Sequence, residues 1–293
     1  MNRLNRIKGG LYGVAIGDAL GGTTEFMTRS EVKNKYGYLT EIIGGGVWDL
    51  EPGEVTDDTM MTLAVGEGIV RNPHDPIPHI GSNFMEWYRS DPKDIGNIIR
   101  RVLSTYNGSW FEAAYLADLD LGQSAGNGSL MRCLPVGLSY PGLPEIDKFS
   151  RLQSKMTHYD ERCSEACTLY NRIVFRIMNE EPLREAVRSE IGNTVYASVL
   201  SREPDCEPSG YVVHSFNWAL FLLLRAESFA EVVQTAANLG GDSDTIAAIA
   251  GGIAGVYDGY EGIPASYSTK ILIRDRLDEL AEQLAAVRAR LIT

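Results

Sequence analysis

Two four-residue clusters in this 293-residue chain each combine two carboxylates with hydroxyl side chains. They are Thr56-Asp57-Asp58-Thr59 and Asp242-Ser243-Asp244-Thr245. Each cluster stands directly before an apolar segment, MMTLAVGEGIV in the first case and IAAIAGGIAGVY in the second. Because carboxylates that face a buried core need a counter-charge, both clusters are candidate cation ligands.

Helix capping is the alternative explanation for both clusters. Ser, Thr and Asp are favoured at helix N-caps, and acidic residues in the first turn interact favourably with the helix dipole. Four carboxylates and several hydroxyls exceed what two helix starts require, and oxygen ligands are what Mg²⁺ and Mn²⁺ select. The pattern therefore favours one shared metal site, and such a site requires the two clusters to meet in space.

Two further carboxylates lie in segments rich in glycine or turn residues. Glu25 belongs to the segment GGTTEFM at 21–27, where a partly buried carboxylate could serve in proton transfer. A solvent-exposed loop glutamate is the alternative. Asp94 precedes Gly96 and Asn97, and there it could equally cap a helix.

The segment GQSAGNGS at 122–129 is a glycine-rich loop, and we expect the following LMRCLPVG to be helical. Backbone N–H groups of such a loop could bind a diphosphate at the N-terminus of that helix. The loop is not a dinucleotide fingerprint, because it contains no G-x-G-x-x-G and follows no hydrophobic strand. A tight turn explains it equally well. His158 stands alone in the sequence and by itself indicates a hydrogen-bonded structural residue.

Helical periodicity dominates the chain, and period-two strands are scarce. Leu4, Ile7, Leu11 and Val14 predict a first helix, which we expect to pack closely because glycines line it. Residues 21–53 are expected to form an irregular loop that leads to the first cluster. Further helical patterns cover 83–89, 95–106, 162–178, 183–190, 212–224 and 229–239, and an amphipathic helix spans 273–291. We therefore predict an all-α fold with a single compact multi-helix domain over residues 1–293.

Charge and cysteine content narrow the class of protein. A net charge of −12 and a pI of about 4.9 disfavour binding to nucleic acid and to anionic membranes. No apolar stretch is long enough for an integral membrane segment, and the N-terminal segment lacks a convincing cleavage site, so we expect a cytoplasmic protein. Cys163 and Cys167 are expected to be buried reduced thiols, because a fourth zinc ligand at a fitting spacing is missing.

Many of these segments also resemble, in order, the motifs of the ADP-ribosylglycohydrolase family. The matching segments are GDALG (17–21), EFM (25–27), IGGG (43–46), TDDT (56–59), DIGN (94–97), AGNG (125–128), MR (131–132), TH (157–158) and GGDSDT (240–245). The resemblance runs nearly from end to end. It is closest to the bacterial dinitrogenase reductase-activating glycohydrolase branch.

The resemblance implies an all-α domain that binds two divalent cations, Mg²⁺ or Mn²⁺. The implied metal ligands are Thr56, Asp57, Asp58, Asp242, Asp244 and Thr245. By the same analogy Glu25 and Asp94 are the candidate acid and base groups. The implied contacts to ADP-ribose are Asn97, Gly126, Asn127, Gly128, His158 and Tyr211.

The activity that the resemblance implies is hydrolysis of the bond between ADP-ribose and an arginine nitrogen of a modified protein. Nitrogenase iron protein is the candidate target, and a PII-type regulatory protein is a candidate partner. Two alternatives stay open: hydrolysis of another linkage, to serine, an acetyl group or nucleic acid, and a non-catalytic relative that binds ADP-ribose. The intact acidic clusters argue against the second alternative, since lost ligands are the expected mark of such a relative.

Overall fold

The computed structural model describes residues 1–292 of the chain, and all regular secondary structure in this range is helical. The prediction of an all-α fold is therefore confirmed. The α-helices are α1 (Arg3–Gly21), α2 (Arg29–Tyr36), α3 (Asp57–Arg71), α4 (Ile77–Arg89), α5 (Asn97–Thr105), α6 (Trp110–Leu121), α7 (Leu134–Ser139), α8 (Leu143–Lys155), α9 (Glu161–Met178), α10 (Leu183–Ile191), α11 (Val212–Arg225), α12 (Phe229–Ala237), α13 (Ser243–Asp258), α14 (Ala265–Ser268) and α15 (Arg274–Ile292). Two short 3₁₀ helices, η1 (Ala197–Leu200) and η2 (Tyr260–Gly262), complete the set.

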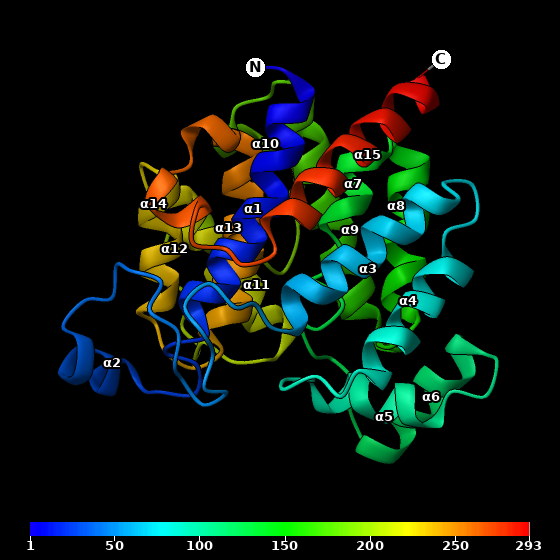
Figure 1. Cartoon of the computed structure of the whole chain (residues 1–293), viewed down its shortest axis with the longest axis horizontal. Coiled ribbons are helices and arrows are strands. Elements are labelled where there is room, and N and C mark those ends of the chain that lie inside the picture. Colours follow the sequence, from blue (N-terminus) through cyan, green and yellow to red (C-terminus); the bar gives the residue numbers. More distant parts are fainter. Residues whose placement is uncertain (293) are drawn as a thin grey trace.

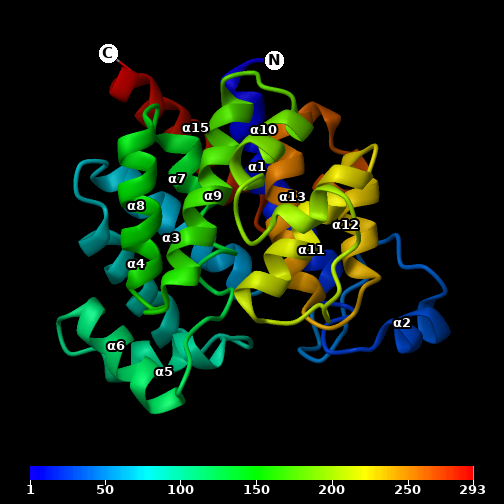
Figure 2. The same cartoon turned by 180° about the vertical axis from the view of Figure 1, so that it is seen from behind.

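The centre of the molecule is an antiparallel pair formed by α1 and α13, which lie side by side in Figures 1 and 2. Small residues allow the two backbones to touch. A Cβ atom at Gly13 would lie 2.0 Å from the carbonyl oxygen of Gly251, and one at Gly17 would lie 2.1 Å from that of Ala247. Real side chains cannot approach so closely, so glycine is required at these positions. The pairing places the end of α1 beside the beginning of α13.

Helices α3 and α15 pack on this central pair. α15 buries its predicted apolar seam, as Leu277, Leu280, Leu284 and Val287 are each no more than 1% exposed. The prediction of an amphipathic helix over 273–291 is therefore confirmed, and its apolar face packs on the core. No helix within residues 1–292 is both long and apolar enough to cross a membrane.

The segment expected to be an irregular loop, 21–53, contains helix α2, so that prediction was wrong in part. α2 begins with a capping box. The Thr28 hydroxyl accepts the N–H of Glu31 at 3.2 Å, and the Glu31 carboxylate accepts the N–H of Thr28 at 2.7 Å. Hydrophobic periodicity missed this helix because Val32 is its only buried residue.

The helix expected directly after the glycine-rich loop starts later than predicted. Residues 128–132 form turns, and α7 begins only at Leu134, with Pro135 in its first turn. The glycine-rich loop is therefore not placed at the N-terminus of a helix, and the diphosphate site cannot use that helix. Helices α6 and α8 were not predicted at all. The cysteine prediction is confirmed, because Cys163 and Cys167 are free, buried thiols on α9.

Candidate active site

One cavity of about 420 Å³ collects most of the predicted site residues from segments far apart in the sequence. The predicted residues that line it are Glu25, Asp57, Asp94, Asn97, Gly126, Asn127, Gly128, His158, Asp242, Asp244 and Thr245. Thr56 and Asp58 are not among the residues that line it, and each is at most 5% exposed. Tyr211 lines an adjoining cavity of about 320 Å³, which shares Asn97 and Gly126 with the first.

The two acidic clusters meet, as a shared metal site requires. Both begin helices, α3 and α13, and the Thr245 hydroxyl donates a hydrogen bond to the Asp58 carboxylate at 3.2 Å. Neither N-cap residue, Thr56 or Asp242, uses its side chain to cap its own helix. Capping alone therefore does not account for the clusters.

The first turn of α3 is capped by a residue from another helix, Asp18 of α1. The Asp18 carboxylate accepts the backbone N–H groups of Thr56 at 3.0 Å and Thr59 at 3.1 Å. It also accepts a hydrogen bond from the hydroxyl group of each of these threonines. Because the Thr56 hydroxyl donates a hydrogen bond to Asp18, the lone pairs of Thr56 Oγ1 stay available for a cation.

Asp18 is a site residue that the sequence analysis did not select. The sequence feature that could have identified Asp18 is that it is a lone carboxylate in an otherwise apolar and glycine-lined helix. It is completely buried, and burial raises its pKa to about 6 although the hydrogen bonds from Thr59 and Thr56 oppose this rise. A buried carboxylate with so many donors is a structural support for the cluster beside it.

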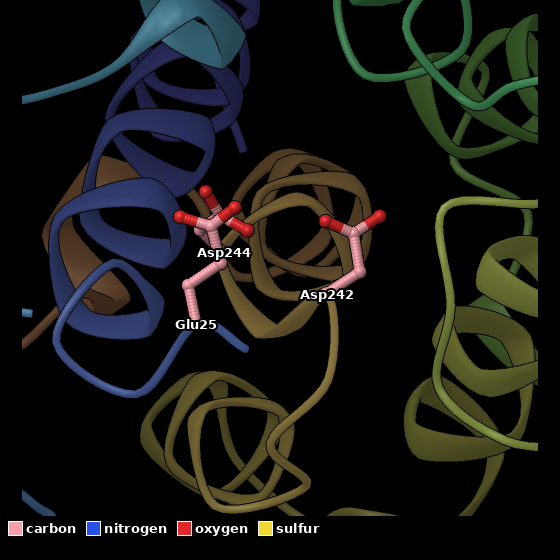
Figure 3. A group of neighbouring side chains, drawn as sticks. All are labelled: Glu25, Asp242 and Asp244. Atoms are coloured by element: carbon pink, nitrogen blue, oxygen red, sulfur yellow. The ribbon is translucent and has the colours of Figure 1, made fainter. Parts of the chain in front are cut away.

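Glu25 joins the second cluster and is not an exposed loop residue, since it is only 6% exposed. Glu25, Asp242 and Asp244 each offer a carboxylate oxygen, and these oxygens lie within 4.8 Å of one another. Figure 3 shows Glu25 entering from the segment after α1, with its carboxylate next to that of Asp244. Backbone hydrogen bonds fix this approach: Phe26 N–H donates to Gly241 O at 2.7 Å, and Gly241 N–H donates to Met27 O at 2.8 Å. The three carboxylates could hold a metal ion.

Burial and mutual repulsion raise the pKa values of the carboxyl groups in this cluster. Burial raises the pKa of Asp57 to about 7 and that of Glu25 to about 8, and the neighbouring carboxylates add to both shifts. Burial also raises the pKa values of Asp58 and Asp244 well above their usual range. Within the described residues Asp58 Oδ1 is buried without a hydrogen-bond partner. A divalent cation fits this donor set, because it would satisfy the orphaned oxygen and offset the repulsion.

Asp94 lies at the edge of the same cluster. It is not the N-cap of α5, since Gly96 occupies that position and donates its N–H to Asp57 Oδ2 at 3.1 Å. Burial and the charges of Asp57 and Glu25 raise the pKa of Asp94 to about 9. Its carboxyl group, which lines the cavity, therefore keeps its proton to a higher pH than an exposed aspartate does.

The glycine-rich loop is held against the segment that precedes α11. Asn127 N–H donates to Gly210 O and Val212 N–H donates to Ala125 O, both at 2.9 Å. The Asn127 side-chain amide donates to Asp242 Oδ2 and, at 2.8 Å, to the hydroxyl of Ser215. Asn127 thus positions one carboxylate of the second cluster.

His158 has a neutral imidazole, and a chain of hydrogen bonds favours the tautomer that carries the proton on Nε2. Arg132 Nη2 donates to Thr157 Oγ1 at 2.8 Å, and this hydroxyl lies 2.8 Å from His158 Nδ1. Since arginine can only donate, the Thr157 proton is free to go to Nδ1, which leaves the imidazole proton on Nε2. Burial and the nearby Arg132 charge lower the pKa of His158 to about 3, so the ring is neutral.

Nε2 of His158 points toward the glycine-rich loop. A Cβ atom at Gly126 would lie 3.3 Å from it, and one at Gly128 would lie at the same distance. The two glycines therefore leave room for a ligand atom at the imidazole edge. Tyr211, further along, accepts a hydrogen bond from Arg162 Nη1 at 2.9 Å through its hydroxyl.

Comparison with known proteins gives one consistent family. The model of the ADP-ribosylglycohydrolase family matches residues 1–291. The chain is 33% identical over 273 residues to the ADP-ribosyl-(dinitrogen reductase) glycohydrolase of Rhodospirillum rubrum, covering 91% of this chain and 90% of that protein. It is 30% identical over 300 residues to an ADP-ribosylarginine hydrolase of Serratia proteamaculans, covering 96% and 79%. A solved ADP-ribosylglycohydrolase-related protein complex contains a chain with a TM-score of 0.84 and 30% identity, covering 98% of this chain and 99% of that chain.

Proposed function

This chain belongs to the ADP-ribosylglycohydrolase family, and we propose that it hydrolyses the N-glycosidic bond between ADP-ribose and an arginine side chain of a modified protein. The main support is the cavity itself, which joins a cluster of carboxylates to a loop of backbone amides and a neutral imidazole. The carboxylate cluster suits a sugar bound through cations, and the loop with the imidazole suits phosphate oxygens. The names of the relatives from Rhodospirillum rubrum and Serratia proteamaculans are consistent with this chemistry.

We infer that the acidic end of the cavity binds two divalent cations, Mg²⁺ or Mn²⁺. The proposed ligands are Thr56, Asp57, Asp58, Asp242, Asp244 and Thr245, with the Glu25 carboxylate next to them. When bound, such cations supply positive charge that orients vicinal sugar hydroxyls and makes a nearby water more acidic. Asp18 and Asn127 would then position ligands, because each hydrogen-bonds a member of the clusters.

Glu25 and Asp94 are the proposed proton-transfer groups. Water adds to the anomeric carbon while the bond from this carbon to the arginine nitrogen breaks, and that nitrogen takes up one proton as it leaves. Both groups line the cavity, and burial raises the pKa of each carboxyl group, which favours the protonated form that a proton donor needs. The carboxylate that loses its proton regains one from the attacking water, which returns the site to its starting state.

The remaining predicted contacts fall at the other end of the cavity. His158 Nε2–H and the backbone N–H groups of Gly126 and Gly128 would donate to phosphate or ribose oxygens. Asn97 and Tyr211 border the adjoining cavity, where the adenosine part of ADP-ribose would lie. Since these contacts come from both halves of the chain, we infer that residues 1–293 form one catalytic domain.

The test of this function is release of free ADP-ribose from a protein modified on arginine. We propose nitrogenase iron protein as the first substrate, because the Rhodospirillum rubrum relative is named for dinitrogen reductase. The assay compares arginine-linked, serine-linked and O-acetyl ADP-ribose, each with and without Mn²⁺. We expect Mn²⁺-dependent release from the arginine linkage. If the protein binds ADP-ribose but releases none from arginine, the hydrolase proposal is wrong.

A further inference from the structure

Two aromatic side chains, Phe26 and Trp48, line the acidic end of the cavity, and we call this pair the aromatic lip. Their ring centroids are 6.5 Å apart, and the rings meet edge to face at 67°. Phe26 is 65% exposed, although a phenylalanine is usually buried in the core. The lip therefore contributes little to the core, which makes it a candidate for ligand binding.

The exposed position of Phe26 is imposed by the backbone. Its φ angle is +61°, which is uncommon for a residue other than glycine and costs free energy. The hydrogen bonds between Phe26 and Gly241, and between Gly241 and Met27, hold the segment in this conformation. The same hydrogen bonds place Glu25 beside the second acidic cluster. The phenyl ring is thus fixed at the mouth of the cavity together with the carboxylate that precedes it.

Trp48 is fixed by the same carboxylate from the other side. Its indole N–H donates to Glu25 Oε2 at 2.6 Å. This bond spans two loops and leaves the indole ring at the cavity surface, where the ring is half-buried. Two aromatic rings at the mouth of the cavity suit a planar cation, because the faces of the rings attract positive charge.

We propose that the aromatic lip binds the guanidinium group of ADP-ribosylarginine and so makes the site selective for the arginine linkage; this inference rests on the proposed function. If the ribose lies at the acidic clusters and the diphosphate at the glycine-rich loop, the group attached to the ribose leaves the cavity past Phe26 and Trp48. A guanidinium is planar and cationic, so it stacks on aromatic rings. Serine and acetyl linkages present a neutral oxygen to the same rings and gain no such attraction.

Selectivity is measured as the ratio of kcat/KM for ADP-ribosylarginine to kcat/KM for ADP-ribosylserine, both on short peptides. Trp48→Leu and Phe26→Leu remove one ring each, and we expect each to lower the ratio about tenfold, the scale of one cation–π contact. Trp48→Phe keeps a ring but loses the N–H, so its ratio should stay close to that of the wild type. Val47→Leu is the matched control, since Val47 is an exposed apolar residue of the same loop that does not line this cavity.

A binding experiment tests the lip independently of turnover. Agmatine, which joins a guanidinium to an ammonium through a butyl chain, is titrated into protein saturated with ADP-ribose. Its analogue N-acetylputrescine, which keeps the ammonium but has a neutral amide in place of the guanidinium, is titrated in parallel. We expect agmatine to bind at least tenfold more tightly than the analogue, and Trp48→Leu to remove this preference. No preference for agmatine in the wild type, or an unchanged preference and ratio in both leucine variants, overturns the proposal. Loss of all turnover with preserved agmatine preference would instead count against the hydrolase function alone.

Discussion

The acidic end and the glycine-rich end of the cavity are built in opposite ways. At the acidic end, carboxylates from α3 and α13 and from the segment after α1 are forced together, and their pKa values rise. At the glycine-rich end, the lining consists of the glycine-rich loop, the neutral imidazole of His158 and apolar side chains. The charge that supports this second end, on Arg132, is completely buried behind it.

This difference in composition determines how each end of the cavity responds to pH and to metal ions. Buried carboxylates at close range need protons or cations, so the state of the acidic end depends on pH and metal. At the glycine-rich end burial keeps His158 neutral, and a chain of hydrogen bonds through Thr157 links its imidazole to Arg132. Perturbations of the first end should therefore abolish chemistry, whereas perturbations of the second should weaken binding.

The largest effect is expected from removal of one carboxylate of either cluster. Asp57→Ala and Asp242→Ala should lower turnover by about 10³-fold or more and abolish most metal binding, because each removes charge that faces a cation. Circular dichroism should show that the helical fold persists. Metal stoichiometry measured on the purified variants checks the prediction. If both variants keep the wild-type stoichiometry, the acidic end is not a metal site.

The next largest effect concerns Glu25. Glu25→Gln keeps the shape of the side chain but removes its proton-transfer capacity, so we expect a rate about 10²-fold lower with ADP-ribose affinity retained. The measurement is single-turnover release of ADP-ribose, with ligand binding followed by calorimetry. A near-normal rate would remove Glu25 from the mechanism and weaken the contrast between the two ends.

The stability of the metal-free protein should fall with rising pH chiefly through the acidic end, and His158, whose pKa burial lowers, opposes this fall below about pH 6.5. Asp18, Asp57 and Glu25 have folded-state pKa values of about 6, 7 and 8, above their unfolded values near 4. The folded state therefore binds more protons than the unfolded state, and the free energy of unfolding falls as pH rises from about 5 to 8. We expect Tm to drop by about 5 °C over this range. Saturating Mg²⁺ or Mn²⁺ should remove the drop, and a rising metal-free Tm would contradict the prediction.

The smallest effect is expected at the glycine-rich end. Thr157→Val removes the hydroxyl between Arg132 and His158, so the imidazole loses the contact that keeps its proton on Nε2. We expect KM to rise about tenfold with kcat within a factor of two or three, the scale of one hydrogen bond. Nitrogen chemical shifts of His158 report the tautomer directly. Thr157→Ser is the control that restores the hydroxyl, and equal KM values in the two variants would exclude the relay.

Local patterns predicted the helix starts at Thr56 and Asp242 because capping residues and apolar periodicity are both read over a few positions. The same approach missed α2, whose capping box precedes a mostly exposed helix. It also extended a helix back to Leu130, where the structure has turns. In the sequence Asp18 is only a charged residue within an apolar helix. Its role could not be predicted, because the N–H groups that it caps belong to another helix.

The sequence by itself determined three features of this protein: a helical fold, two clusters of oxygen ligands and an ordered set of family motifs. Only the tertiary structure decided which of these side chains meet. It joined Thr245 to Asp58, Asn127 to Asp242 and Trp48 to Glu25. The physical reason is that helix periodicity and capping are local, whereas burial, pKa and hydrogen-bond partners depend on how α1 and α13 pack through their glycines.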